Sequence, residues 1–255
     1  MRGTTNFMKN LFAIFTFLFF STSSFCQSSI ETDRPDQTET SFIVPKNKFQ
    51  AETGIKHEKT DKGENEYTLP TSLLKFGLSE ILELRVILEF GYSETEKGIE
   101  SGLKPVIVGT KVKLFDEKGI VPAASLLAQF QLPKVASSDF KAAHLAPEFR
   151  LLMQNKLSDA SDLGYNVGAE WDGLSCQPEY IFTISPNYDI TKKLKAFVET
   201  YGFLQSRHHA EQWVDGGFSY LLSDNMKLDI SGGYELTHTS NYHNFFESIG
   251  FSFRI

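Results

Sequence analysis

Cysteine is scarce in this chain, since only Cys26 and Cys176 occur among its 255 residues. Two cysteines so far apart form no CxxC motif for a metal or a redox centre, and they provide no disulfide framework. The sequence also lacks any run of 18 or more apolar residues. Because a transmembrane helix needs about 20 such residues, a chain of this kind can cross a membrane only with strands.

Positive charge is in the minority: 25 Lys and Arg residues stand against 32 Asp and Glu residues, for a formal net charge of -7. Binding of nucleic acid depends on clustered Lys and Arg side chains that neutralise phosphates, so we expect no nucleic-acid partner. A phosphate-binding glycine loop, a paired-carboxylate signature and a zinc-hydrolase motif are missing as well. We therefore expect no catalytic residues, no metal site, no cofactor and no enzymatic activity.

The first 26 residues have the pattern of a secretory signal. Basic residues precede the short apolar stretch LFAIFTFLFF at 11–20, and small residues follow it. Ser24 and Cys26 occupy the -3 and -1 positions of a cleavage site before Gln27. We predict that residues 1–26 are a signal peptide, which implies export; a buried N-terminal helix and a lipid anchor on Cys26 are the alternatives.

Alternation of apolar and polar residues recurs from residue 48 to the end of the chain. In the clearest case, LELRVILEFGYS at 82–93, Leu84, Val86 and Phe90 share one face with other apolar residues, whereas Glu83 and Arg85 lie on the opposite face. A helix would scatter these two sets around its circumference, while a strand separates them. The pattern predicts a chain built from strands.

We count 12 such strands, and the connections between them alternate in length. The shorter ones lie near 79–80, 116–119, 158–161, 191–193 and 223–225; the longer ones lie near 59–66, 93–103, 133–142, 172–178, 206–211 and 237–244. Membrane barrels sort their connections in this way, with short periplasmic turns and longer external loops. The sequence therefore predicts an all-β protein, a 12-stranded antiparallel transmembrane β-barrel over residues 48–255.

In such a barrel the apolar face of each strand meets outer-membrane lipid and the charged face encloses a wet lumen. Charges of both signs there can cross-link the wall or set ion preference. From the alternation we expect the following residues to line the lumen: Glu52, Glu83, Arg85, Glu89, Lys111, Lys113, Glu148, Arg150, Glu170, Glu199, Asp215, Asp229, Glu235 and Arg254. If Glu199 faces the lumen, Phe197, Tyr201 and Phe203 do too, which predicts a bulge or a partly filled interior at 194–205.

The chain ends on SIGFSFRI, in which Ile249, Phe251, Phe253 and Ile255 share one face. This segment resembles the final strand of outer-membrane proteins, which the barrel-assembly machinery recognises by alternating apolar residues and a hydrophobic or aromatic last residue. The resemblance implies the outer membrane of a Gram-negative bacterium as the location and the assembly machinery as a partner.

Residues 27–47 precede the first strand and lack periodicity. The sequence TDRPDQTET, followed by VPKNKFQAETG, resembles the N-terminus of the outer-membrane transporter family labelled "putative MetA-pathway of phenol degradation", which is related to the exporter of functional amyloid. The resemblance implies a barrel with a transporter role. We expect Asp33, Arg34, Pro35 and Asp36 to bind lumen residues, so that the segment acts as a periplasmic plug; a flexible exported tail is the alternative.

The combined interpretation is an outer-membrane channel that passes a small-molecule solute of unknown identity by diffusion through a narrow charged lumen. Three alternatives stay open: a structural or adhesive barrel without throughput, a lipid-modifying enzyme that uses His238 and Ser240, and a soluble periplasmic β-protein that binds an apolar ligand inside. The loop histidines, which include His208 and His209, are more often solvated than metal-bound.

Overall fold

The computed structural model describes residues 29–255 except 61–63, 96–97, 176, 206–209 and 238–243. The signal peptide predicted at 1–26 lies outside these residues, as do His208, His209, His238 and Ser240. In the part of the chain that is described, no helix is long and apolar enough to cross a membrane.

The described residues form 13 strands and a short 3-10 helix, η1 (Ser138–Phe140). The strands follow the alternating segments of the sequence, because alternation allows each strand to place apolar side chains on one face and polar side chains on the other. They are β1 (Phe49–Lys59), β2 (Asn65–Gly77), β3 (Leu82–Thr95), β4 (Gly98–Leu103), β5 (Ile107–Phe115), β6 (Ala123–Gln131), β7 (Ala146–Ser158), β8 (Ser161–Glu170), β9 (Glu179–Asp189), β10 (Leu194–Gln205), β11 (Glu211–Ser223), β12 (Met226–Glu235) and β13 (Phe245–Arg254).

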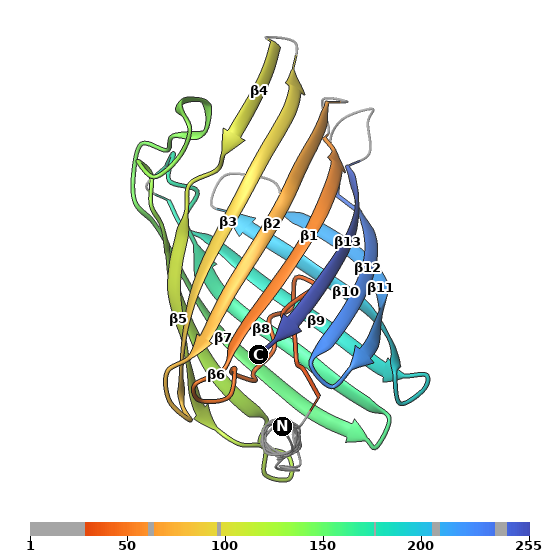
Figure 1. The fold of residues 1–255 in the computed structure, drawn as a ribbon. Helices are drawn as coiled ribbons and strands as arrows, with labels where there is room; N and C mark the ends of the chain where they lie inside the picture. The colour runs from red at the N-terminus through yellow and green to blue at the C-terminus, as the bar shows by residue number, and fades with distance from the viewer. Residues whose placement is uncertain (1–28, 61–63, 96–97, 176, 206–209, 238–243) are drawn as a thin grey trace, which may run out of the picture.

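The strands close into a barrel (Figure 1). Every neighbouring pair is antiparallel, and β1 pairs with both β2 and the last strand, β13. Strands β4 and β5 together occupy one position beside β3, since they pair with successive parts of that strand. The register slips by one residue between them, at Lys104–Val106, where Pro105 has no amide hydrogen to donate to the ladder. The predicted all-β, 12-stranded antiparallel barrel is confirmed.

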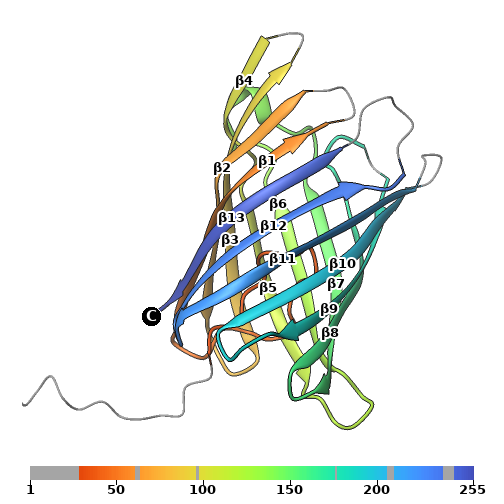
Figure 2. The ribbon, with the colours of Figure 1, turned by 90° about the vertical axis from the view of Figure 1, so that its right-hand side faces the viewer.

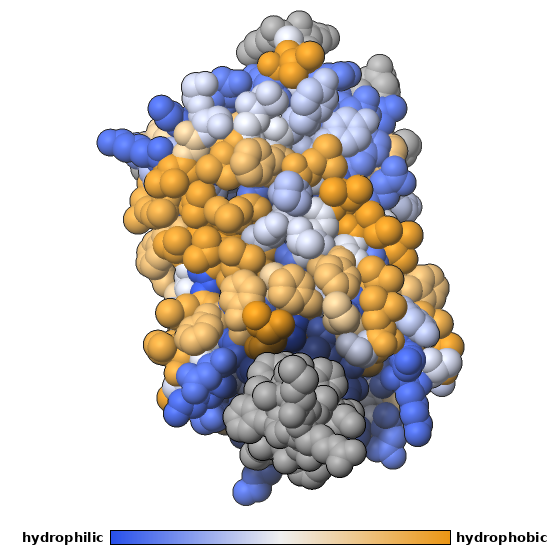
Figure 3. All heavy atoms as spheres, viewed as in Figure 1, coloured by the Kyte–Doolittle hydropathy of each residue, from blue (hydrophilic) through white to orange (hydrophobic). Residues whose placement is uncertain are grey.

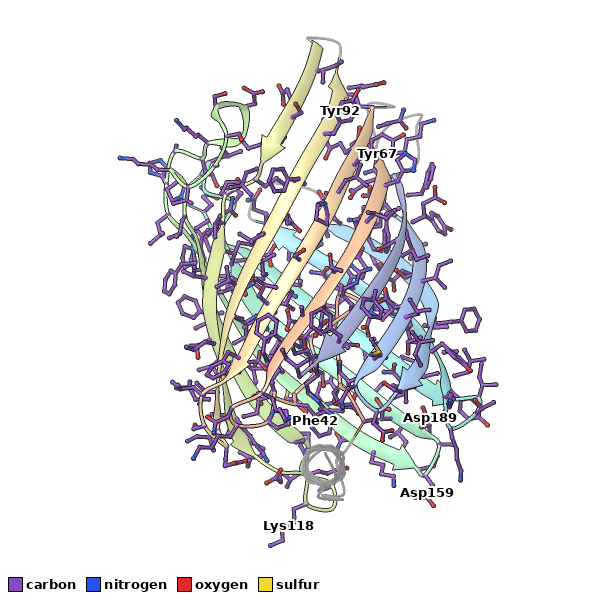
Figure 4. The ribbon with its side chains drawn as sticks, in the orientation of Figure 1. Phe42, Tyr67, Tyr92, Lys118, Asp159 and Asp189 are labelled. Carbon is purple, nitrogen blue, oxygen red and sulfur yellow. The ribbon has the colours of Figure 1, made fainter. Side chains whose placement is uncertain are left out.

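Connections at the two ends of the barrel differ (Figure 2). Strand β1 starts and β13 ends at the end that carries the short connections, which we call the turn end; the opposite end is the loop end. In Figure 4, Lys118, Asp159 and Asp189 mark the turn end, while Tyr67 and Tyr92 mark the loop end. The expectation of a long loop at 93–103 is wrong, because β3 continues to Thr95 and β4 begins at Gly98. These two strands pair from Phe90–Leu103 to Thr95–Gly98 and extend beyond the rest of the wall (Figure 1).

On the face seen in Figure 3, the outer surface is largely apolar across its middle and hydrophilic toward both ends. On β3, 44% of Leu84 and 50% of Phe90 is exposed, whereas Glu83 is fully buried and Arg85 is 2% exposed. Tyr180 and Tyr188, at opposite ends of β9, are both exposed, as expected for the aromatic girdles of a membrane barrel. The apolar residues of the alternating pattern therefore face outward and the charged residues face inward.

Candidate functional site

The structure places all 14 residues predicted to line the lumen on the inward face of their strands. Ten of the 14 are buried: Glu52, Glu83, Arg85, Lys111, Arg150, Glu199, Asp215, Asp229, Glu235 and Arg254. Glu89, Lys113, Glu148 and Glu170 are partly exposed. Charged side chains this deeply buried need hydrogen bonds or ion pairs. Residues N-terminal to β1 provide many of these interactions.

Residues 29–47, which we call the N-terminal segment, run through the inside of the barrel (Figures 1 and 2). The amide of Ile30 donates to the Asp224 carbonyl at the turn end (2.8 Å). Further along, the Ser41 carbonyl accepts from Ser125 Oγ (2.5 Å) and the amide of Val44 donates to Glu83 Oε2 (2.8 Å). The segment thus contacts inward residues of strands on several sides of the wall.

Asp33 is the centre of the contacts that hold this segment. Its Oδ2 accepts from Lys75 Nζ (2.8 Å), its Oδ1 accepts from Lys111 Nζ (2.7 Å), and Arg85 Nη1 lies 3.6 Å from Oδ2. Asp33 Oδ1 also accepts from the amide of Thr40 (3.2 Å), which closes the loop 33–40 on itself. Burial alone would raise the pKa of the Asp33 carboxyl, but the charges of Lys111, Lys75 and Arg85 outweigh burial and hold that pKa well below its usual value.

Glu39 and Glu52 complete this ionic cluster. The guanidinium of Arg85 donates two parallel hydrogen bonds to the Glu39 carboxylate, both 2.7 Å long, which is the strong bidentate geometry of an Arg–carboxylate pair. Glu52 Oε2 accepts from the amides of Asp33 and Arg34 (3.0 Å each), and Glu52 Oε1 forms an ion pair with Lys75. The ionic cluster therefore consists of three acids and three cations. The acids are Asp33 and Glu39 of the N-terminal segment and Glu52 of β1, and the cations are Lys75, Arg85 and Lys111 of the wall.

Arg34 points the other way, toward β12 and β13. Its Nη2 donates to Asp229 Oδ1 (2.9 Å) and to Ser248 Oγ (2.8 Å). The guanidinium lies over Gly54 and Gly250, which face each other in the β1–β13 register. A Cβ atom at either glycine would lie 2.4–2.6 Å from guanidinium atoms, so only glycine at these two positions leaves room for the Arg34 side chain.

Two further residues of the predicted motif also lie in the lumen. Asp36 Oδ2 accepts from Ser185 Oγ (2.9 Å), and the Pro35 carbonyl lies 3.4 Å from Ser231 Oγ. Burial and the neighbouring Glu199 carboxylate raise the pKa of Asp36 well above its usual value.

Both sides of the inner wall carry buried charges of both signs, such as Glu83 on β3 and Lys227 on β12, but the charges that meet the N-terminal segment differ between the two sides. Lys75, Arg85 and Lys111 project from β2, β3 and β5, whereas Glu199, Asp215 and Asp229 project from β10, β11 and β12. The N-terminal segment presents Asp33 and Glu39 to the first group and Arg34 to the second. Its charges therefore complement both sides of the lumen.

Aromatic side chains fill part of the lumen on the β10, β11 and β13 side. Tyr201 stacks on Trp213 with ring centroids 6.0 Å apart, and Trp213 packs against Phe246 at 6.1 Å. Phe203 meets Tyr201 edge to face at 5.9 Å. Of the two alternatives expected for 194–205, the structure shows the filled interior, because the pairing of β10 keeps one register with both neighbours.

Several residues of this site were missing from the sequence prediction. Three of them, Lys75, Trp213 and Phe246, lie on inward faces. The alternation of apolar and polar residues in their strands identifies those faces, so counting every second residue could have found them. Glu39 lies in a segment without periodicity. No local signal in the sequence pairs Glu39 with Arg85, 46 residues away.

The four residues of the predicted assembly signal lie on the outward face of the last strand and just beyond it. Ile249 and Ile255 are 52% and 68% exposed, and the Phe251 and Phe253 rings stack at 6.1 Å. Strand β13 joins β1 to β12, so this segment closes the barrel.

A closed antiparallel barrel with an apolar outer belt and a charged interior is the architecture of an outer-membrane β-barrel protein. A family model described as "Putative MetA-pathway of phenol degradation" matches residues 32–255. The chain belongs to this family. A search of the curated proteins finds no match.

Solved structures show the same fold. The COG4313 outer membrane channel from Pseudomonas putida F1 superimposes with a TM-score of 0.65 at 10% identity, over 88% of this chain and 100% of the other. The KdgM porin (TM-score 0.54) and the NanC porin (0.53) are each 12% identical and are covered over 98% of their length, against 79% and 80% of this chain. At these identities the likeness shows the fold.

Proposed function

We propose that this protein is an outer-membrane channel that passes small solutes by diffusion, and that residues 29–47 form a plug in its lumen. The observation that carries the proposal is the path of the N-terminal segment through a closed barrel, where its Asp33, Glu39 and Arg34 form ion pairs with the inner wall. The family to which the chain belongs and the channels and porins with the same fold support it.

The lumen residues then have two roles in this proposal. Those bound to the plug, such as Lys75, Lys111 and Asp229, hold it in the closed position. When the plug leaves, the same side chains become free charges on opposite sides of the pore, and they select solutes by charge. A solute with both a carboxylate and an apolar ring would meet the cationic side and the aromatic cluster of Tyr201 and Trp213.

The same proposal includes export by a signal peptide and location in a Gram-negative outer membrane. It also includes recognition of the C-terminal strand by the barrel-assembly machinery. The exposed apolar face of β13 supports them. The turn end, with the short turns, the start of β1 and the end of β13, would then lie on the periplasmic side, as in other membrane barrels. The alternative of a lipid-modifying enzyme rests on His238 and Ser240, which lie outside the described residues.

The proposal is tested by the conductance of the refolded protein in planar bilayers, across a panel of inorganic ions and aromatic acids. We expect small, infrequent current steps from the wild type, because the plug occupies the lumen. A barrel that stays silent both as wild type and with the plug weakened by substitution would contradict the channel and would favour a structural or adhesive role.

Replacing Arg34 with alanine removes the plug's contacts with Asp229 and Ser248. Losing one hydrogen-bonded charged pair is expected to increase the ratio of open to closed channel about tenfold. Lys192→Ala, in the exposed turn between β9 and β10, is the control and should leave the current unchanged. Equal conductance of the Arg34→Ala variant and the wild type would argue against a plug.

A further inference from the structure

The outer face of the barrel carries a hollow of about 890 Å³ that the channel function does not explain. It runs across β11, β12, β13, β1 and β2, which lie side by side in Figure 2. Its floor includes Gly216 and Gly232, which face each other in the β11–β12 register and have no side chains to fill the space. Its apolar walls are formed by Ile55, Leu69, Phe218, Ile230 and Ile249.

A polar pair borders this hollow. Glu247, whose side chain is 70% exposed, lies 3.2 Å from His57 Nδ1. The other ring nitrogen of His57 lies 3.2 Å from Asn65 Oδ1, and the Tyr67 ring stacks on the imidazole at 4.7 Å. Glu247 therefore stands on the outward surface with most of its side chain exposed, and a carboxylate in contact with lipid is costly unless it gains hydrogen-bond donors.

The order of outward residues along β1 matches the order of groups in a membrane lipid. From the middle of the barrel toward the loop end, this face presents Ile55, then His57, then Lys59. These are an apolar, a hydrogen-bonding and a cationic side chain in turn. A membrane lipid would meet them in the same order, with its acyl chain at Ile55, its polar junction at His57 and its anionic headgroup at Lys59.

We propose that the hollow binds a phosphorylated, acylated amino-sugar lipid of the outer leaflet, a lipid of the lipid A type. One acyl chain fills the space above Gly216 and Gly232. The amide N–H and acyl-chain hydroxyl groups at the acyl–sugar junction donate to Glu247, and a phosphate approaches Lys59. A glycerophospholipid fits less well because its acyl junction carries ester oxygens, which accept hydrogen bonds and offer none to the carboxylate.

Lipid retained by the full barrel tests this proposal. The wild type and variants are refolded, exchanged into detergent with equal amounts of lipid A and phosphatidylethanolamine, and examined by native mass spectrometry. Glu247→Leu removes the acceptor, and Gly232→Leu fills the floor. Val167→Phe adds bulk on the outward face of β8, where 49% of Val167 is exposed, and is the matched control. Heat-modifiable gel mobility verifies that each variant is folded.

We expect one lipid A on the wild type and on Val167→Phe, in preference to phosphatidylethanolamine. Glu247→Leu and Gly232→Leu should each bind lipid A about tenfold more weakly. Equal retention by Glu247→Leu and the wild type would overturn the proposal, as would equal retention of the two lipids. A wild-type dimer that Gly232→Leu abolishes would overturn it too, because a second copy would then be the occupant.

Discussion

Replacing Asp33 with alanine is expected to convert the channel from mostly closed to mostly open. Asp33 pairs with Lys75 and Lys111 inside the barrel, and it also accepts from the Thr40 amide that closes the 33–40 loop. Removing one partner of a buried ionic cluster costs about 3–5 kcal/mol, which favours the released plug by more than about a hundredfold. In planar bilayers the time-averaged current should rise accordingly.

Two controls separate loss of the plug from damage to the barrel. Asp159→Ala removes an acid from an exposed turn, where Asp159 pairs with Lys156 at 2.9 Å, and should leave the current at the wild-type level. In an Asp33→Ala, Cys176→Ser background, a disulfide between cysteines at Thr38 and Thr183, whose hydroxyls lie 2.7 Å apart, should restore the closed state until it is reduced. High current in the oxidised form would contradict the assignment of residues 29–47 as the plug.

The second large effect is expected at Arg85. Arg85→Met removes the bidentate partner of the largely buried Glu39 carboxylate and leaves it Lys111 Nζ at 3.3 Å, so the free energy of unfolding should fall by about 3–5 kcal/mol. Adding Glu39→Gln removes the carboxylate that has lost this partner and should recover part of the loss, giving a coupling energy of about 1 kcal/mol or more. Urea unfolding in lipid vesicles measures all four members of the cycle.

The exposed pair of Lys156 and Asp159 is the comparison for this cycle. Lys156→Met removes a charge from a pair that water surrounds, so no measurable change in unfolding free energy is expected. Additive losses from Arg85→Met and Glu39→Gln would show that the two side chains do not stabilise each other. That result would contradict the ionic cluster around Asp33.

The barrel wall could be predicted from the sequence because alternation carries two kinds of information at once. In 82–93 it indicates a strand, and it also separates Leu84 and Phe90 from Glu83 and Arg85. Alternation alone does not say which face of a strand points outward. The signal-like N-terminus, the even number of strands and the C-terminal strand indicated a membrane barrel, in which the apolar face is the outer one. The same parity places Trp213 and Phe246 inside, although their apolar character argues for the opposite face.

The interior arrangement could not be predicted to the same extent. Arg34 and Asp229 are 195 residues apart, and their contact depends on the curvature of a closed wall and on the space above Gly54 and Gly250. An irregular segment has no periodicity that fixes its direction, so the pairing of Asp33 with three cations required the structure. The β4 extension was missed because its polar sequence is typical of a loop.

The central claim is that the apolar faces of the strands look out at lipid while the charged faces enclose the lumen. Spin labels placed one at a time along β3, in a Cys176→Ser background, test it most directly through their accessibility to oxygen, which dissolves in lipid, and to a water-soluble nickel complex. Labels at Leu84, Val86 and Phe90 are predicted to be oxygen-accessible, and labels at Ile87 and Glu89 to be shielded from oxygen. Oxygen accessibility at Ile87 and Glu89, with Leu84 and Phe90 shielded, would contradict the account.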